Sequence, residues 1–409
     1  MPSVAISFEF DGRAISARPG DSIAAALSEA GVTSYRHTRE GEPRGMFCGM
    51  GVCADCLVVV DGLRSQRACM VEARSGLRVE SQHDARSSSW QSVVPIGVEQ
   101  EMPLDVPDEA VHCEHRDVIV LGAGPAGLQA ALKLCAAGLS VTLVDEREQL
   151  GGQYYKPRSQ GSRARQALDR QHRKGRALRR RIADSAVNLR LGEVAWFARR
   201  ADDGNSFEVR TTRDQKQCRY TCKALLLATG AYERPAVVPG WTLPGVMTIG
   251  AGQTLVRRYG VTPGRRVVIA GHGPLGLQLA YEMSLQGVDV VALLERAKPR
   301  IGWHMVAAAC LSPGLLLQAA RYRLRLMRRG IPIHYGHEIT RLSGVEKVER
   351  VEYANRDTGK LASIEADMIF AGDGFSPQAE LARLLGCTVD VDGVSGGVLV
   401  KRASNGESG

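Results

Sequence analysis

The chain has 409 residues, of which 44% are hydrophobic and 24% are charged, and its formal net charge is +9 at pH 7. This length is too great for one compact core and predicts about two to four domains of ordinary soluble composition. No apolar run reaches the ~18–20 residues that span a bilayer, and no basic segment followed by an apolar one opens the chain. The sequence therefore argues against a membrane-spanning or secreted protein and favours the cytoplasm.

The first 82 residues predict a small α+β domain. Residues 4–10 alternate apolar and polar side chains, as a half-buried strand does, and the Asp11-Gly12 pair after them is a hairpin-turn signal. Asp21 and Ser22 are candidate N-caps for the apolar segment that follows, which ends at a glycine. The predicted elements are strands at 4–10, 14–18, 57–62 and 77–82 and a helix at 23–30.

Four of the ten cysteines lie in one short segment, with the spacing Cys48-x4-Cys53-x2-Cys56-x12-Cys69. Three closely spaced cysteines and a distal fourth are the plant-type arrangement of a [2Fe–2S] site. The glycines between them allow the loop to fold so that the thiolates converge. Zinc remains an alternative, although its usual pattern has two C-x2-C pairs and only one occurs here. A disulfide framework is disfavoured in a reducing compartment.

Two segments carry little periodic apolar pattern. Residues 83–115 are rich in Ser, Pro and acidic residues and predict a surface linker. Residues 163–181 contain nine Arg or Lys residues, which predict a solvated helix face, with contact to an acidic partner as the alternative. Few aromatic residues interrupt this basic run, which argues against nucleic acid as a partner.

A strand–turn–helix–strand pattern begins at residue 117. Its turn reads Gly122-x-Gly124-Pro125-x-Gly127, and Asp145, with Glu146 beside it, comes 23 residues after the first glycine. In such a turn the glycines permit the tight bend, the approach of a pyrophosphate and close helix packing, while the acid bonds ribose hydroxyls. The segment therefore predicts a dinucleotide-binding domain.

A second copy of this pattern occupies residues 266–295, with Gly271, Gly273 and Gly276 in the same places. The corresponding acid, Glu295, comes one residue later than Asp145 does, because the same count ends at Leu294. One step along a strand turns a side chain to the other face of the sheet. We therefore expect a shifted or lost ribose contact at this second site, which is a candidate for NAD or another adenine nucleotide.

Three stretches carry a family resemblance: DVIVLGAGPAGLQAALKLCAAGLSVTLVDEREQLGGQYYK, LLLATGAYERPAVVPGWTLPGVMTIGAGQTLV and FAGDGFSPQAELARLLGC. They resemble the pyridine-nucleotide-disulfide reductase superfamily and, more narrowly, the FAD-containing α-type subunits of hydrogen cyanide synthase, opine oxidase and heterotetrameric sarcosine oxidase. The N-terminal 82 residues resemble the small [2Fe–2S] subunit of such complexes. The resemblance covers nearly the whole chain.

The resemblance implies roles for particular residues and for a partner. The first glycine turn and Asp145 would hold the ADP part of FAD, Gly151, Gly152 and Gln153 would lie near the flavin, and Thr229 and Gly230 would mark the crossing to an inserted NAD-like domain. In such complexes a β subunit that resembles D-amino-acid or glycine oxidase oxidises the substrate. The chain would then be an electron-transfer subunit of a hetero-oligomer, with possible peripheral contact with a respiratory acceptor at the inner membrane.

The sequence departs from the family pattern in two ways. The flavoprotein part has no C-x2-C or C-x4-C pair; its closest pair, Cys218 and Cys222, lies four residues apart in strand-like sequence, too far for a bridge. The phrase that follows Gly372-Asp373-Gly374 ends the NAD-like domain in the family, so the motif that closes the FAD domain is expected beyond the last residue. We therefore expect either that the chain is a fragment of a longer protein or that its FAD site is incomplete.

The sequence thus predicts an α/β protein with a β-grasp-like ferredoxin domain and two doubly wound Rossmann-like domains, the second inserted in the first. Its predicted function is electron transfer in an amine dehydrogenase complex. The alternatives are an NAD(P)H-dependent reductase and a flavin-free interaction subunit. No catalytic acid or base is assigned. The predicted boundaries are 1–82 for the ferredoxin domain, 83–115 for the linker, 116–240 for the FAD domain, 241–375 for the NAD(P)-like domain and 376–409 for an incomplete return segment.

Overall fold

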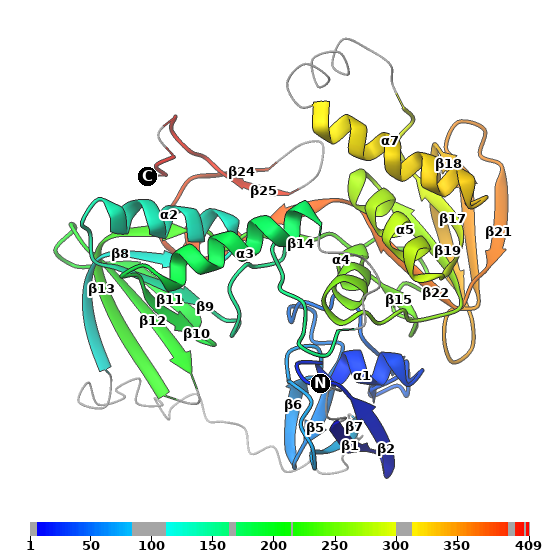
Figure 1. The fold of residues 1–409 in the computed structure, drawn as a ribbon, viewed down its shortest axis with the longest axis horizontal. Helices are drawn as coiled ribbons and strands as arrows, with labels where there is room; N and C mark the ends of the chain where they lie inside the picture. The colour runs from blue at the N-terminus through cyan, green and yellow to red at the C-terminus, as the bar shows by residue number, and fades with distance from the viewer. Residues whose placement is uncertain are drawn as a thin grey trace. The chain divides into compact units, whose positions relative to one another are not determined.

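The computed structural model describes residues 6–83, 112–162, 169–213, 216–299, 313–391, 397–404 and 406–408. It has two compact units, in which helices pack on β-sheets (Figure 1). Unit 1 consists of Met1–Arg86, Arg158–Ala167 and Glu233–Gly374, and unit 2 of Ser87–Pro157, Leu168–Tyr232 and Phe375–Gly409. The predicted α/β class is confirmed. Most of the predicted linker, and part of the basic run, lie outside the described residues. No described helix combines the length and the apolar character needed to cross a membrane.

The N-terminal part of unit 1 is a sheet of seven strands packed against one helix. Its strands run in the order β2-β1-β7-β3-β4, and β5 pairs with both β6 and β7. The helix α1 begins after Ser22, whose Oγ accepts the Ala25 N–H at 3.2 Å, so Ser22 rather than Asp21 is the cap. The bounds are β1 Ile6–Phe10, β2 Arg13–Ala17, α1 Ile23–Glu29, β3 Arg36–His37, β4 Pro43–Arg44, β5 Leu57–Val60, β6 Leu63–Arg67 and β7 Arg78–His83.

The second part of unit 1 is built on a five-stranded sheet of order β15-β22-β16-β17-β18, in which all neighbours run parallel. Parallel strands joined through helices are the doubly wound arrangement that the glycine motif predicts. A three-stranded antiparallel sheet, β19-β20-β21, follows it. The bounds are β15 Val246–Met247, α4 Ile249–Gln253, π-helical η3 Thr254–Tyr259, β16 Arg266–Gly271, α5 Pro274–Gln286, β17 Asp289–Glu295, α7 Pro313–Arg328, β18 Ile333–Tyr335, β19 His337–Ser343, β20 Arg350–Asn355, β21 Leu361–Glu365 and β22 Met368–Gly372.

Unit 2 contains a six-stranded sheet of order β10-β9-β8-β13-β12-β11, with α2 and α3 side by side over it (Figure 1). The apolar stripe of α3 is buried, with Leu178 and Ile182 in the core, so its Arg and Lys residues lie mainly on the solvent side. The bounds are β8 His112–Leu121, α2 Pro125–Ala136, β9 Val141–Asp145, α3 Arg170–Ala183, β10 Asn188–Leu191, β11 Val194–Arg200, β12 Phe207–Arg213, β13 Lys216–Leu227, β14 Ala231–Glu233, β23 Phe375–Pro377, α8 Glu380–Leu384, β24 Val389–Val391 and β25 Val398–Val400.

One apolar core runs through unit 1 and joins its two parts. Buried side chains of the N-terminal sheet and helix, such as Ile23 and Val58, belong to the same cluster as Ile249 and Leu255 of the second part. Burying this surface removes apolar area from water and stabilises the two parts together. The cysteine loop of the N-terminal part is therefore held against a nucleotide-binding fold.

Candidate functional site

The four cysteines of the N-terminal part lie in a loop whose backbone bends at small residues. Gly49, Gly51 and Ala54 have positive φ angles of 61°, 86° and 57°. These bends turn backbone N–H groups toward sulfur: Met50 donates to Cys48 Sγ at 3.4 Å, and Asp55 donates to Cys53 Sγ at 3.5 Å. Hydrogen bonds from the backbone to sulfur stabilise thiolates and tune a cluster that they hold.

The four thiols influence one another, most strongly Cys48 with Cys53 and Cys56 with Cys69. Cys53 hydrogen-bonds to Cys48 and, with backbone donors, lowers the pKa of the Cys48 thiol to about 5, while the pKa of Cys53 is raised. In the same way Cys69 lowers the pKa of Cys56, and the pKa of Cys69 is raised by Cys56 and by burial. Each pair thus contains one thiol that loses its proton readily, and the thiolate is the metal-binding form.

The four thiols fit a [2Fe–2S] cluster, because Cys48 acts on both Cys56 and Cys69 as well as on Cys53. In a [2Fe–2S] cluster four cysteines share two irons. Cys48, Cys56 and Cys69 are buried and Cys53 is half-buried, with exposed Val52 and Ala54 on either side of it. The donor set and its shielding fit the cluster.

The cysteine loop rests on the short helix α4, a contact that the sequence did not reveal. The Thr248 N–H donates to the Phe47 carbonyl at 3.0 Å, and a Cβ on Gly49 would lie only 3.1 Å from Ala251. The buried Glu233 carboxylate accepts the N–H groups of Ile249 at 2.9 Å and Gly250 at 2.7 Å, and so fixes the start of α4.

In unit 2 the first glycine turn has the predicted geometry. Gly122 has a φ of 106°, and a side chain there would overlap the Ala228 carbonyl, while a Cβ on Gly127 would overlap the Gly122 carbonyl. A Cβ on Gly124 would meet nothing within 4 Å, so the backbone there borders open space. No side chain caps α2, which begins at Pro125, so its first N–H groups remain for an anion. This turn fits a pyrophosphate.

The acid of this turn is in contact with it. Asp145 accepts the Ala123 N–H at 2.6 Å with one oxygen and the Arg147 N–H at 2.8 Å with the other. Each carboxylate oxygen keeps a second lone pair, which a ribose hydroxyl can use. The neighbouring Glu146 side chain is exposed.

Two other predicted segments come to the same end of this sheet. Gly151 donates its N–H to the Ala123 carbonyl at 2.9 Å, and a Cβ on Gly152 would lie 2.8 Å from the Gly124 Cα. Gln153 is exposed. Thr229 and Gly230 follow Ala228, which borders Gly122, and they are joined to Gln378 by bonds of 3.2 Å and 3.0 Å. The structure therefore brings the residues of the predicted flavin site together around one glycine turn.

In unit 1 the second glycine turn corrects one expectation. Glu295 does not face away: its carboxylate accepts the Gly273 N–H at 3.3 Å and the Ala297 N–H at 3.0 Å, so like Asp145 it bonds its own turn, although one residue further along that turn. A register shift between Val267 and Val268 lets β17 take in one extra residue opposite β16, so that Gly271 pairs with Glu295. The bulge offsets the one-residue displacement. The expectation that Glu295 faces away from its turn is therefore wrong, while the predicted shift or loss of a ribose contact stays a prediction.

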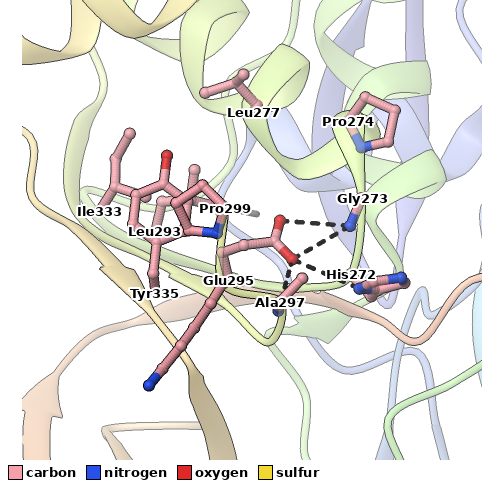
Figure 2. A pocket seen from close by; sticks show the side chains of 11 residues that line it. His272, Gly273, Pro274, Leu277, Leu293, Glu295, Ala297, Pro299, Ile333 and Tyr335 are labelled. Carbon is pink, nitrogen blue, oxygen red and sulfur yellow. Dashed lines mark hydrogen bonds and ion pairs between the residues drawn. The ribbon is translucent and has the colours of Figure 1, made fainter. Parts of the chain in front are cut away.

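A cavity of about 250 Å³ opens beside Glu295 (Figure 2). Glu295 points from β17 toward Gly273 and the exposed His272, whose Nδ1 lies 3.6 Å from the carboxylate. Its lining residues are His272, Gly273, Pro274, Leu277, Leu293, Glu295, Ala297, Lys298, Pro299, Ile333 and Tyr335. An apolar wall with one carboxylate is the chemistry that an adenosine group fits.

The Gly372-Asp373-Gly374 segment lies beside this second turn. Gly372 pairs with Gly271 across β22 and β16, and Arg296 Nη1 donates to Asp373 at 2.9 Å from either oxygen. Gly276 differs from Gly127, because a Cβ there would lie 3.4 Å from the nearest atom, which is ordinary contact.

Cys218 and Cys222 lie in β13 and are free cysteines. They pair with Thr211 and Phe207 of β12 respectively, in regular antiparallel register. The structure agrees with the sequence argument that they form no redox dithiol.

The chain matches two families. Residues 3–84 match the 2Fe-2S iron-sulfur cluster binding domain, and residues 116–401 match the pyridine nucleotide-disulphide oxidoreductase family. Such domains hold a [2Fe–2S] cluster and FAD respectively.

Three curated relatives have similar sequences. An opine oxidase subunit of Agrobacterium tumefaciens (strain Ach5) is 33% identical over 66% of this chain and 54% of its own length. Hydrogen cyanide synthase subunit HcnB of Pseudomonas protegens is 30% identical over 66% of this chain and 58% of its own. The alpha subunit of sarcosine oxidase from Rhizobium meliloti (strain 1021) is 28% identical over 93% of this chain and 41% of its own. The chain thus spans about half the length of these relatives.

Two solved structures share the fold. L-proline dehydrogenase from P. horikoshii superposes with a TM-score of 0.67 at 20% identity, over 99% of this chain and 66% of that one. Thioredoxin reductase from T. acidophilum gives a TM-score of 0.53 at 22% identity, over 72% of this chain and 86% of that one.

Proposed function

Because the chain belongs to the pyridine nucleotide-disulphide oxidoreductase family and carries a 2Fe-2S domain before it, we propose that it is the electron-transferring subunit of an amine-oxidising complex. It would take electrons from a partner that oxidises an amino acid, an opine or a secondary amine at its C–N bond, and deliver them to an external acceptor. Bound FAD would supply two-electron chemistry and the cluster one-electron chemistry.

The arrangement of the cysteines carries this proposal. Cys48, Cys53, Cys56 and Cys69 place four thiols in one loop region with the plant-type [2Fe–2S] spacing. The loop backbone donates N–H groups to sulfur and keeps three of the four cysteines away from water. Of these four cysteines Cys53 is the most exposed, and we propose its side of the loop as the route for electrons.

A second observation supports an outlet through this loop. Outside residues 48–69 the sequence has no C-x2-C or C-x4-C pair, and Cys218 and Cys222 sit in a regular strand. Burial raises the pKa of Cys222 to about 11, so this thiol stays protonated and unreactive near neutral pH. A dithiol relay would instead need a thiol whose pKa is lowered, so that the reactive thiolate forms near neutral pH.

The partner is proposed from the relatives. The similar opine oxidase and sarcosine oxidase chains are both named as subunits of oxidases. We propose a hetero-oligomer with a β subunit that resembles D-amino-acid or glycine oxidase, in which the substrate is oxidised on the partner. No catalytic acid or base is assigned to this chain.

The cavity beside Glu295 favours one alternative. A chain that binds NAD(P)H there would be a reductase on its own, with electrons entering from the nucleotide rather than from a partner protein. Oxygen-free addition of NADH to the purified holoprotein separates the two functions. We expect the flavin absorbance near ~450 nm to persist with NADH and to bleach only with an amine-oxidising partner and its substrate. Rapid bleaching by NADH alone would overturn the proposal.

The cluster residues are tested by Cys53→Ser. The variant should lose the visible absorbance of the cluster and keep any flavin, because Cys53 belongs to unit 1 and the first glycine turn to unit 2. Iron content and flavin content are measured on the same sample. Joint loss of both cofactors would contradict separate sites.

A further inference from the structure

The helix α7 has one face fixed against unit 1. It packs on α5, beside which it lies in Figure 1. The Tyr322 ring stacks on Tyr281 of α5 with centroids 4.3 Å apart, and Leu326 is fully buried in the core. These two contacts determine which side of α7 points inward and leave the opposite side to solvent.

The outward side carries an apolar stripe. Leu317, Leu324 and Met327 are 75%, 47% and 65% exposed. Their spacing of seven and three residues places them on one face, with the exposed Ala320 between the first two. Large apolar side chains gathered on one exposed helix face mark a surface that something covers.

Arginines border this stripe. Arg321 and Arg328 are exposed and each follows a stripe leucine by four residues, so they lie alongside it. On the other flank the Arg323 guanidinium lies 5.5 Å from the centre of the Tyr335 ring. Residues 313–328 contain four arginines and no acidic residue. The covering surface must therefore be negatively charged as well as apolar.

We propose that this face of α7 binds the surface of an anionic lipid bilayer. A helix that places Leu and Met side chains between flanking arginines lies in the plane of the headgroups, with its apolar side chains in the acyl boundary and its guanidinium groups on phosphates. Residues 313–328 hold four arginines and no acidic residue, which suits a surface whose charged groups are anionic phosphates. The proposal is independent of the electron-transfer function.

The helix α3 of unit 2 offers a matched comparison. Its solvent side is also basic, with exposed Arg176 and Arg180, but it exposes no large apolar side chain. General attraction of a basic protein to anionic lipid would involve α3 as much as α7. Insertion of the apolar face of α7 into the bilayer would not depend on the basic residues of α3.

The test is flotation of the full chain with vesicles. One set contains phosphatidylcholine alone and the other equal parts of phosphatidylcholine and phosphatidylglycerol. The variants are Leu317→Gln with Leu324→Gln, Arg321→Glu with Arg328→Glu, and, as the control in α3, Arg176→Glu with Arg180→Glu. Thermal melting checks that each variant is folded, as expected for exposed positions.

The wild-type chain should float with the anionic vesicles alone. Both α7 variants should bind them at least about tenfold more weakly, while the α3 control should lose much less. Absence of flotation, an equal loss in the α3 variant, or full binding by the leucine variant would overturn the proposal. A wild-type dimer in sedimentation that the leucine variant dissociates would also overturn it, because the face would then join two copies of the chain.

Discussion

At the scale of single residues, the two glycine turns are each bonded by a carboxylate but differ in packing. Asp145 and Glu295 each accept one N–H from their turn and one from the residue two positions further on. The last glycine of each motif differs. Gly127 has a neighbouring carbonyl where a Cβ would be, whereas Gly276 has room for one. The last glycine of the motif is therefore required by packing in the first turn, but not in the second.

This difference gives a paired prediction. Gly127→Ala should destabilise unit 2 by about 2 kcal/mol or more and prevent flavin binding, because the new Cβ would overlap the Gly122 carbonyl. Gly276→Ala should change stability by less than about 1 kcal/mol, since an alanine is also the better helix former. Flavin content and thermal melting of both variants measure this. Equal losses in the two variants would contradict the packing argument.

At the scale of elements, α4 links the cysteine loop to the second nucleotide-binding part. It is a short helix whose first N–H groups are bonded by the buried Glu233 carboxylate. Glycine at positions 250 and 372 leaves space for this carboxylate, because a Cβ at either would lie 2.7 Å or 2.5 Å from its oxygens. A substitution of Glu233 should therefore lower the stability of the cysteine loop.

Glu233→Ala should destabilise unit 1 by about 1–3 kcal/mol, because two N–H groups would lose a buried acceptor. The cluster absorbance should also decay faster on heating, since α4 supports Gly49 and Phe47. The exposed Glu346→Ala is the control and should leave both properties unchanged. A cluster that decays at the wild-type rate in Glu233→Ala would show that α4 does not stabilise the loop.

His334 in β18 predicts a pH effect on the stability of unit 1. Burial, followed by the charge of His337, lowers the pKa of His334 in the folded chain. As the pH falls below about 6.5, the unfolded chain gains a proton that the folded chain resists, so stability is lost toward acid. His334→Phe keeps a ring against Tyr353 and His337 and removes this titration.

The melting temperature of His334→Phe should therefore fall less than that of the wild type between about pH 7.5 and about pH 5.5. Melting curves of both proteins in matched ionic strength check it. If the melting temperature falls equally in the wild type and in His334→Phe, groups other than His334 cause the acid sensitivity.

At the scale of the whole molecule, one apolar cluster of unit 1 spans both of its parts, beside a second cluster that contains Val268 and Tyr353. The N-terminal sheet shares its apolar cluster with the second nucleotide-binding part, while the glycine turn of unit 2 rests on a separate cluster that contains Leu143. Elements that share a core unfold together. The cysteine loop should therefore depend on residues far from it in sequence.

Leu255→Ala and Leu143→Ala test this dependence. Both leucines are fully buried, and each substitution should cost about 2–5 kcal/mol in its own unit. Leu255→Ala should lower the temperature at which the cluster absorbance is lost, because Leu255 belongs to the core of unit 1. Leu143→Ala should leave that temperature unchanged. If both variants or neither shift it, the division of cores does not govern the stability of the loop.

The sequence alone predicted the α/β class, the cysteine loop and both glycine turns. These features depend on spacing along the chain, since a turn, a helix start and a ligand loop are set by neighbouring residues. The four strand segments and the helix of the N-terminal part were found for the same reason. The short strands β3 and β4 were missed, because two-residue strands have no period to detect. The strand β6, Leu63–Arg67, was missed as well, because it is largely exposed and does not alternate apolar and polar residues.

Only the tertiary structure decided which way Glu295 faces and which elements support the cysteine loop. The bulge that returns Glu295 to its turn is a property of the pairing between β16 and β17, and pairing partners are distant in sequence. The contact of the cysteine loop with α4 joins residues about 200 positions apart through a shared core. Local chemistry is encoded in neighbouring residues, whereas these arrangements arise when separate segments bury their apolar faces against one another.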